Sequence, residues 1–381
     1  MQNIVILGST GSIGKSSLEI IRANRDKFNV SCLVASTNEK LISNQAREFK
    51  KAKIYLEKKA KSKSSERTID RKQLYDLISD SKVDTVIAAI SGSDGLELTH
   101  HSIISGKKVL LANKEPLVMG GDFLMNLAKK HNSEIIPIDS EHCGVHQSIN
   151  GKDIKTVSKI TLTCSGGPFH SLPKSEFKTI NLKKALKHPV WKMGKKISID
   201  SSTLMNKALE IIEAKYLFGI DKDKIEAIIH PEGLVHSFVE FVDGTTLASM
   251  AKPDMKIPIS YGLGFPKIIN NKINKVDLQK LANLSFEKID RKKFPSIDFA
   301  YYAINQGGGM PIVLNAANEL AVDYFMKEKI KFTDIFRLIS STLSYVDKNN
   351  IKLKSVSLDS ILNFYDEIKE ITSKNLKNFI K

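Results

Sequence analysis

The sequence predicts an α/β protein with an N-terminal, doubly wound (Rossmann-like) parallel sheet, a second α/β catalytic domain and a C-terminal helical bundle. Three observations lead to this fold class. Strand-like and helix-like segments alternate from residue 3 to residue 137, which is typical of a parallel sheet covered by helices. Three strand-like segments at 225–251 look like an antiparallel edge. Four amphipathic helical patterns follow, at 298–306, 312–328, 332–344 and 357–373.

The composition is that of a globular protein of two or three domains. The chain has 381 residues and a net charge of +16, with lysines crowded at 50–72. Because no zinc-finger, RRM or KH motif accompanies this charge, a lysine-rich solvated surface is favoured over nucleic-acid binding. No apolar run approaches the roughly 20 residues of a membrane span, so we expect no membrane partner. No signal peptide is visible, and three widely spaced cysteines suggest reduced thiols and a cytoplasmic location.

The first strand runs into a glycine turn. NIVILGSTGSIG at 3–14 is a buried-strand pattern followed by Gly8, Gly11 and Gly14 and then by a helical run. Such a turn lets the backbone approach a pyrophosphate at the helix start, although the spacing is GxxGxxG rather than GxGxxG. The second strand, at 30–36, is followed by no acid until Glu39. NADP is therefore favoured over NAD, whose ribose is usually held by an acid at this place.

The remaining strands of this sheet are KIYL, DTVIAAI, KKVLLA and EIIPI, with helices near 70–80, 95–105 and 117–131 between them. Ligands of such sheets lie beyond the carboxyl ends of the strands. Ser91-Gly92 and the run 113–115 (Asn-Lys-Glu) each follow a strand, so we expect them to face the cofactor.

Asp139-Ser140-Glu141 directly follows the last of these strands. In extended chain the two carboxylates share one side of the backbone, which favours an oxygen-rich Mg²⁺ or Mn²⁺ site with Glu210 as a third ligand. A solvated turn or a helix cap is the alternative.

Residues 188–213 predict a phosphate site. The pattern predicts that Ser201 and Ser202 cap the N-terminus of a helix that follows a short strand. Asn206, Lys207 and Glu210 then fall on the polar face of that helix. A helix start with hydroxyls, an amide and a lysine suits a phosphate, and an ordinary solvated face is the alternative.

Two loops complete the predicted site. Ser165-Gly166-Gly167 follows a strand-like run and suits phosphate binding through its backbone. The weakly patterned stretch 170–196 contains Trp191 and Met193, and we interpret it as a mobile lid, with a packed loop as the alternative.

Taken together and in this order, GSTGSIG, NKE, DSEH, SGGPF, HPVWKMG, DSSTLMNKALE, HPEGLVHS, PDMKIPI and NAANELAV closely resemble the 1-deoxy-D-xylulose 5-phosphate reductoisomerase family. The likeness covers nearly the whole chain. It implies an oxidoreductase and isomerase that uses NADPH and a divalent cation, Mn²⁺ or Mg²⁺ with Co²⁺ possible. Its reaction would convert the phosphosugar 1-deoxy-D-xylulose 5-phosphate into 2-C-methyl-D-erythritol 4-phosphate, an early step of non-mevalonate isoprenoid (isoprene) biosynthesis. It also implies a homodimer to which the strands at 225–251 contribute.

Carried over residue by residue, the resemblance implies a complete site. The metal ligands would be Asp139, Glu141 and Glu210. The other substrate contacts would be Lys114, Ser140, Ser165, Ser201, Asn206 and Lys207, with His188 nearby. The NADPH contacts would be Thr10, Gly11, Ser12, Ile13, Asn113, Glu115 and Gly194. Trp191 and Met193 would belong to a flap at about 186–196, and Pro253 would wall the pocket.

The chain departs from the family pattern in two places. The family usually shows Gly-Lys-Asn after the second strand, where this chain has Ser36-Thr37-Asn38. The two hydroxyls or Lys40 would have to replace the missing lysine at the 2′-phosphate. HPEG at 230–233 replaces the more usual HPQS, which leaves Glu232 unexplained.

The predicted organisation is an NADPH-binding domain at 1–139, a metal- and substrate-binding domain at 140–265, a linker at 266–289 and a helical domain at 290–381. Two alternative functions remain open. The glycine turn would also fit another NADP-dependent reductase, such as a semialdehyde dehydrogenase or a dihydrodipicolinate reductase. A semialdehyde dehydrogenase would need Cys143 or Cys164 as its nucleophile. A non-enzymatic regulator that binds nucleic acid would fit the basic charge.

Overall fold

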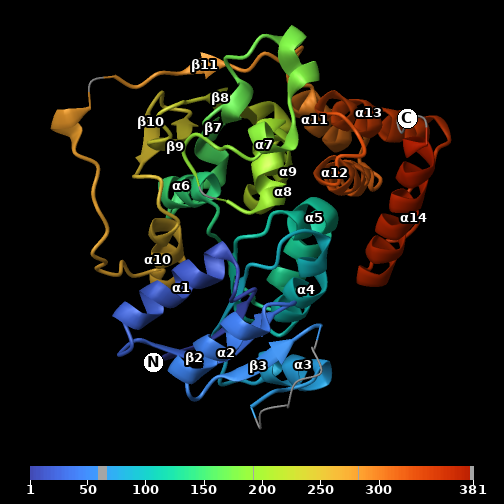
Figure 1. Ribbon diagram of the computed structural model, residues 1–381. Coiled ribbons are helices and arrows are strands. Elements are labelled where there is room, and N and C mark those ends of the chain that lie inside the picture. The colour runs from blue at the N-terminus through green and yellow to red at the C-terminus, as the bar shows by residue number, and fades with distance from the viewer. Residues whose placement is uncertain (59–66, 192, 282, 378–381) are drawn as a thin grey trace. The chain divides into compact units, whose positions relative to one another are not determined.

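The computed structural model describes residues 1–58, 67–191, 193–281 and 283–377, and its chain divides into two compact units (Figure 1). Unit 1 comprises Met1–Pro116, Leu124–His146 and Asp254–Asn274. Unit 2 comprises Leu117–Phe123, Gln147–Pro253 and Lys275–Lys381. No helix in the described ranges combines the length and the apolar character that a bilayer crossing needs.

Unit 1 is built on a six-stranded, fully parallel sheet in the order β3-β2-β1-β4-β5-β6. The strands are β1 (Gln2–Leu7), β2 (Phe28–Ala35), β3 (Lys53–Leu56), β4 (Thr85–Ala88), β5 (Lys108–Leu111) and β6 (Ile135–Pro137). The helices are α1 (Ser12–Ala23), α2 (Glu39–Glu48), α3 (Arg71–Ser79), α4 (Leu96–Ile104), α5 (Glu115–Lys130), α6 (Ser140–Ile149) and α10 (Lys256–Gly264). The sequence prediction of a doubly wound parallel sheet is confirmed.

The strand order places a topological switch point at β1, because the chain leaves β1 for β2 on one side and returns to β4 on the other. The carboxyl ends of the neighbouring strands are aligned: Leu7 pairs with Ala88, and Ala35 pairs with Leu56. In open α/β sheets a ligand binds outside these ends, at such a switch point.

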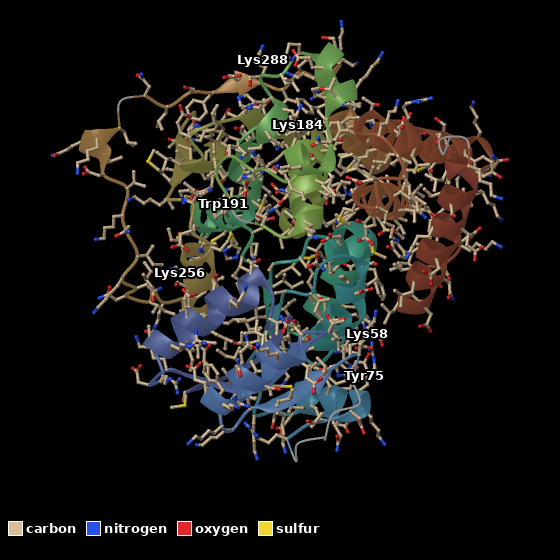
Figure 2. The ribbon with its side chains drawn as sticks, in the orientation of Figure 1. Lys58, Tyr75, Lys184, Trp191, Lys256 and Lys288 are labelled. Carbon is tan, nitrogen blue, oxygen red and sulfur yellow. The ribbon has the colours of Figure 1, made fainter. Side chains whose placement is uncertain are left out.

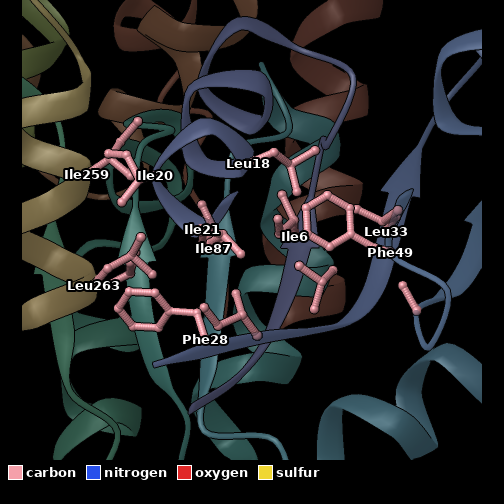
Figure 3. Packing of buried hydrophobic residues seen from close by; sticks show 14 of the residues in the cluster. Ile6, Leu18, Ile20, Ile21, Phe28, Leu33, Phe49, Ile87, Ile259 and Leu263 are labelled. Atoms are coloured by element: carbon pink, nitrogen blue, oxygen red, sulfur yellow. The ribbon is translucent and has the colours of Figure 1, made fainter. Parts of the chain in front are cut away.

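One hydrophobic core of unit 1 lies between the sheet and the helices α1 and α10, and another involves residues of the helices α3 and α4. Figure 3 shows Ile259 and Leu263 of α10 beside Ile20 of α1 and Phe28 of β2. Ile259 and Leu263 are fully buried. Each such side chain contributes about 1.5–3 kcal/mol through burial, so α10 is an integral part of this unit although it comes more than a hundred residues after β6.

Unit 2 contains a five-stranded mixed sheet in the order β10-β9-β7-β8-β11 and a set of helices. The strands are β7 (Val157–Cys164), β8 (Ile225–Ile229), β9 (Val235–Phe241), β10 (Thr246–Met250) and β11 (Glu287–Lys288). The helices are α7 (Leu182–Ala185), α8 (Lys195–Ser202), α9 (Met205–Phe218), α11 (Ser296–Gln306), α12 (Met310–Met326), α13 (Phe332–Lys348) and α14 (Leu358–Leu376).

The three strands predicted as an antiparallel edge are all present, but their arrangement is wrong in one respect. β9 and β10 pair antiparallel, whereas β8 lies on the other side of β7 and runs parallel to it. The helix α9 lies between β7 and β8 in the chain and provides the crossover that a parallel pair requires.

The C-terminal helices α11 to α14 agree with the four predicted patterns to within a few residues at each end. The helix α12 packs against α13 and α14, and it also contacts α8. The domain boundaries at 139, 265 and 289 remain predictions. The compact units add two features that the sequence did not indicate: the segment at 254–274 belongs to unit 1, and the middle of α5 belongs to unit 2.

Candidate active site

The glycine turn between β1 and α1 is the first part of the site. Gly8 has a φ of +86°, and a Cβ on it would lie 2.4 Å from the carbonyl oxygen of Ala89, so only glycine fits there. Gly11 is the N-cap of α1 and supplies no capping side chain. The amides of the first turn and the helix dipole therefore suit an anionic ligand. The predicted cofactor residues, Thr10, Gly11, Ser12 and Ile13, all lie at this helix start, and their donor set fits a pyrophosphate.

The residues after β2 form the second part. Ser36, Thr37 and Asn38 are exposed, and the Oδ1 atom of Asn38 accepts the N–H of Leu41 at 3.1 Å, which caps α2. The first acidic residue after β2 is Glu39, which is also the first residue of α2. This strand end fits a cofactor with a 2′-phosphate better than one with a free 2′-hydroxyl.

The loops after β4 and β5 are tied together by Asn113. This side chain is 6% exposed, and its Nδ2 atom donates to the carbonyl of Gly92 at 2.8 Å. A Cβ on Gly95 would lie 2.6 Å from the same nitrogen, so the two loops pack closely. The predicted cofactor residue Glu115 follows at the start of α5 and is also buried.

Asp139 precedes α6, and Ser140 and Glu141 are its first residues. The prediction of extended chain for this run is therefore wrong: the run begins a helix, and the carbonyl of Asp139 accepts the N–H of Cys143 at 2.8 Å. The Nζ atom of Lys114 lies 2.7 Å from Oδ2 of Asp139, and Ser140 donates to Glu141 at 2.6 Å. Unit 1 thus presents two carboxylates and a lysine beyond β5 and β6.

In unit 2 the phosphate-site prediction falls on a corner between two helices. Ser201 and Ser202 are the last residues of α8, so their prediction as N-cap residues, and that of a strand before them, is wrong. The chain turns at Leu204, which has a φ of +56° and is the N-cap of α9. The alternation of apolar and polar residues in Ile197-Ser198-Ile199 favours a strand locally. Packing overrides it, since Ile199 is fully buried and α8 contacts α12.

Asn206, Lys207 and Glu210 come together at the start of α9. The Nδ2 atom of Asn206 and the Nζ atom of Lys207 both donate to the carboxylate of Glu210. The side chains of Lys207 and Glu210 are only 2% and 1% exposed, so the alternative of an ordinary solvated face is wrong. Desolvation offsets much of the attraction in such a buried pair, so fold stability alone does not account for it.

A supporting residue that the sequence analysis did not identify lies one position before Ser201. Asp200 is 2% exposed, lies 3.1 Å from Nζ of Lys196 and accepts a hydrogen bond of 2.8 Å from Nδ2 of Asn318 on α12. These contacts fix the end of α8 to the helical bundle. The spacing of four residues between Lys196 and Asp200 could have indicated their ion pair, but nothing in the sequence indicated the hydrogen bond from Asn318 on α12.

The loop after β7 lies against the same corner. Gly167 has a φ of +66°, and a Cβ on it would lie 2.6 Å from the carbonyl oxygen of Ser201. The Nδ1 atom of His188 accepts the N–H of Trp191 at 2.8 Å, so the neutral imidazole carries its proton on Nε2 and donates it to Oγ of Ser165 at 3.1 Å. Ser165 also accepts the N–H of Gly167 at 3.3 Å. Its own hydroxyl proton therefore remains available for a further acceptor.

The predicted flap at 186–196 includes Lys192, which lies outside the described residues. Trp191 packs over His236 of β9, with ring centroids 6.4 Å apart, and Figure 2 labels it in unit 2. Met193 and Pro253 are half-buried, and Gly194 is the exposed N-cap of α8. The mobility of this segment remains a prediction.

Glu232, unexplained by the sequence, holds two segments of unit 2 together. Its carboxylate accepts the N–H of Ser285 at 3.2 Å and lies 3.0 Å from Nδ1 of the buried His230. Burial acts to raise the pKa of Glu232, but the hydrogen bonds from Ser285 and from its own backbone N–H, together with the nearby His230, outweigh it, and the pKa lies below its usual value. Glu232 is therefore a structural residue that anchors the segment before β11.

The cysteines give no support to the dehydrogenase alternative that needs a thiol nucleophile. Cys143 is 2% exposed, and the Sγ atom of Cys164 donates to the carbonyl of Ile228 at 3.5 Å. Burial raises the pKa of the Cys32 thiol to about 12. Reactive cysteines have lowered pKa values and accessible sulfur atoms.

Comparison with known proteins gives the same result along the whole chain. A family model described as 1-deoxy-D-xylulose 5-phosphate reductoisomerase matches residues 4–121. A second model, described as the 1-deoxy-D-xylulose 5-phosphate reductoisomerase C-terminal domain, matches residues 135–218. A third, described as the DXP reductoisomerase C-terminal domain, matches residues 250–371. The reductoisomerase of Thermoanaerobacter sp. strain X514 is 41% identical, covering 98% of this chain and 99% of that protein. That of Chloroherpeton thalassium is 43% identical over 91% of this chain and 92% of that protein.

Solved structures agree. A DOX-P reductoisomerase in complex with NADPH, fosmidomycin and magnesium is 37% identical, with a TM-score of 0.92 over 99% of this chain and 98% of that chain. The reductoisomerase of Zymomonas mobilis in complex with NADPH is 33% identical, with a TM-score of 0.88 over 98% of this chain and 99% of that chain. These matches favour the predicted family over the other reductases and the regulator considered above. The chain belongs to the 1-deoxy-D-xylulose 5-phosphate reductoisomerase family.

Proposed function

We propose that this protein uses NADPH and a divalent cation to rearrange and reduce 1-deoxy-D-xylulose 5-phosphate to 2-C-methyl-D-erythritol 4-phosphate, in non-mevalonate isoprenoid precursor biosynthesis. The observation that carries the proposal is family membership across the full chain, with 41% identity to a named reductoisomerase. The two structural neighbours described above hold NADPH, and one of them also holds magnesium.

We assign the metal to Asp139 and Glu141 of unit 1 and to Glu210 of unit 2. The chemistry of this donor set supports the assignment, because carboxylate oxygens are the ligands that Mg²⁺ and Mn²⁺ prefer. Mn²⁺ or Mg²⁺ is our assignment, with Co²⁺ as a further candidate. Lys114 and Lys207 each pair with one of these acids, so part of the negative charge is already compensated.

We assign the substrate phosphate to the corner of unit 2 formed by the Ser165 loop, the end of α8 and the start of α9. Ser165, Ser201 and Asn206 offer neutral donors, Lys207 offers a charge, and His188 orients Ser165. Binding of the phosphate would supply energy for orienting the reacting carbons and for closing the flap residues Trp191 and Met193 over the substrate. Pro253 would line the pocket.

We assign NADPH to the carboxyl edge of the sheet in unit 1. Thr10, Gly11, Ser12 and Ile13 would bind the pyrophosphate at the start of α1, and Ser36, Thr37 and Asn38 would lie near the adenosine ribose. Asn113 and Glu115, with Gly194 of unit 2, would complete the cofactor site. These residues would hold NADPH and so orient the nicotinamide for hydride transfer.

The chemistry divides between the bound groups and the chain. The divalent cation, when bound, supplies Lewis-acid polarisation of the substrate's carbonyl and hydroxyl. Lys114 would stabilise negative charge that develops on the substrate oxygen, and Ser140 would orient the adjacent hydroxyl. The flap residues would exclude water while the carbon skeleton rearranges and the aldehyde is reduced.

Two further proposals concern assembly and location. We propose a homodimer, because β10 is an edge strand of its sheet among the described residues and Val242, in the turn between β9 and β10, is 69% exposed. We propose a cytoplasmic location, supported by the finding that none of the three cysteines forms a disulfide, since a reducing compartment disfavours disulfides.

The proposed activity is tested with purified protein, NADPH, 1-deoxy-D-xylulose 5-phosphate and Mn²⁺ or Mg²⁺. We expect NADPH absorbance to fall and mass spectrometry to identify 2-C-methyl-D-erythritol 4-phosphate as the product. NADPH consumption that yields a different product, or none at all, would contradict the proposal.

A further inference from the structure

The edge of the unit 1 sheet brings a lysine of one strand beside the turn that follows the neighbouring strand. Lys58 comes two residues after β3, and its backbone N–H donates to the carbonyl oxygen of Ser36 at 2.9 Å. The preceding bond of the same ladder joins the N–H of Glu57 to the carbonyl of Ala35 at 3.0 Å. The parallel pairing of β2 and β3 thus continues beyond the strand ends and fixes Lys58 next to Ser36.

The turn after β2 lacks a positive charge of its own. In dinucleotide-binding sheets this turn lies at the 2′ position of the adenosine ribose, where a 2′-phosphate calls for a cation. Ser36 and Thr37 offer only hydroxyl groups, and the Oδ1 atom of Asn38 is engaged in capping α2. The nearest charge along the chain is the carboxylate of Glu39, which opposes binding of a phosphate.

Lys58 is suited to supply the missing charge. It is exposed, and no carboxylate of the described ranges forms an ion pair with it. Its neighbour Glu57 is engaged elsewhere, because it accepts from the hydroxyl of Tyr55 at 2.7 Å and pairs with Arg71 at 3.1 Å. Figure 2 labels Lys58 in the same part of unit 1 as Tyr75 of α3. A lysine on its four-carbon stem acts as a mobile point charge for a phosphate.

We propose that Lys58 contacts the 2′-phosphate of NADPH and sets the preference of this enzyme for NADPH over NADH. The inference rests on the proposed function, since it concerns the cofactor of that reaction. It assigns specificity to the strand beside β2, not to the turn after β2 itself. Lys40, in the first turn of α2, is the rival cation and serves as the matched control.

The test is calorimetric binding of NADPH and of NADH to the wild type and to the variants Lys58→Gln, Lys40→Gln and Lys58→Arg. Each Gln variant removes one exposed positive charge, so all should fold. Lys58→Gln should weaken NADPH binding about tenfold, the change expected for one charge contact to a phosphate, and leave NADH binding within about twofold. Lys58→Arg should keep the preference, and Lys40→Gln should change it little.

An unchanged ratio of the two dissociation constants in Lys58→Gln would overturn the role of Lys58 and leave the proposed function intact. An equal or larger loss of NADPH preference in Lys40→Gln would also overturn it and assign the contact to Lys40. A wild-type protein that binds neither dinucleotide would overturn both this inference and the proposed function.

Discussion

Replacing Glu210 by Gln perturbs two things at once, and the structure allows them to be separated. The side chain of Glu210 is 1% exposed and pairs with Lys207, which is 2% exposed. Glutamine removes the negative charge beside the buried Lys207 ammonium, and loss of one charge from a buried pair costs about 3–5 kcal/mol. For a unit of this size each kcal/mol lowers the unfolding midpoint by roughly 2–4 °C, so we expect a decrease on the order of 10 °C.

Two assays measure the stability of the fold and the binding of the metal separately. Thermal unfolding in EDTA reports the buried charge, and Mn²⁺ titration followed by electron paramagnetic resonance reports the metal site. The matched control is the double variant Lys207→Met/Glu210→Gln, in which no buried charge is left unpaired. We expect the double variant to recover most of the lost midpoint, because a buried pair replaced on both sides is close to neutral. Its Mn²⁺ binding should stay as weak as that of Glu210→Gln.

Two results would refute this reasoning. A Glu210→Gln midpoint equal to that of the wild type would mean that the Lys207–Glu210 pair is not buried as described. Wild-type Mn²⁺ affinity in the double variant would remove Glu210 from the metal site, whatever the stability.

Four further predictions follow from individual contacts. Leu263→Ala should destabilise unit 1 by about 2–5 kcal/mol in urea unfolding, because Leu263 is fully buried in its core, and an unchanged midpoint would argue against the position of α10. Ser165→Ala should raise the KM for the phosphosugar about tenfold but leave the dissociation constant of NADPH unchanged, and a shift in both would contradict its assignment to the phosphate. The pKa of Glu232 is lowered on folding, so its carboxylate stabilises the fold above the ordinary pKa, and this stabilisation is lost as the pH falls through the pKa of the folded protein. The difference in unfolding midpoint between wild type and Glu232→Gln should therefore shrink below about pH 4. Growth of that difference would exclude the stabilising contact between Glu232 and Ser285. Cys32, whose pKa is raised to about 12, should not react with a thiol reagent at neutral pH until the protein unfolds, and rapid labelling of the native protein would show that it is accessible.

Much of unit 1 could be predicted because local pattern and global fold agree there. A short apolar strand, a glycine turn and an amphipathic helix follow one another, and Gly8 is required by the contact with Ala89. The parallel direction of the strands then follows from the alternation of strands and helices. Parallel strands also align their carboxyl ends, which is why Asn113 and Asp139 could be assigned to one edge.

The errors in unit 2 arise where tertiary packing outweighs local preference. Residues 197–199 favour a strand, but they form part of α8 because Ile199 is buried and the helix contacts α12. Lys207 was placed on the polar face of its helix, and its burial was not foreseen because charged residues are seldom fully buried. Its burial depends on the carboxylate of Glu210, a compensation that periodicity alone does not reveal. The partner of Glu232, the N–H of Ser285, lies 53 residues away and has no signal in the sequence.

The most direct test of the central claim is the dependence of NADPH oxidation on the metal. Protein stripped with EDTA and supplied with 1-deoxy-D-xylulose 5-phosphate and NADPH should be inactive, and Mn²⁺ or Mg²⁺ should restore its turnover in the wild type but not in Asp139→Asn. Full turnover by the stripped protein in the continued presence of EDTA would contradict a reaction that depends on a cation held by these carboxylates.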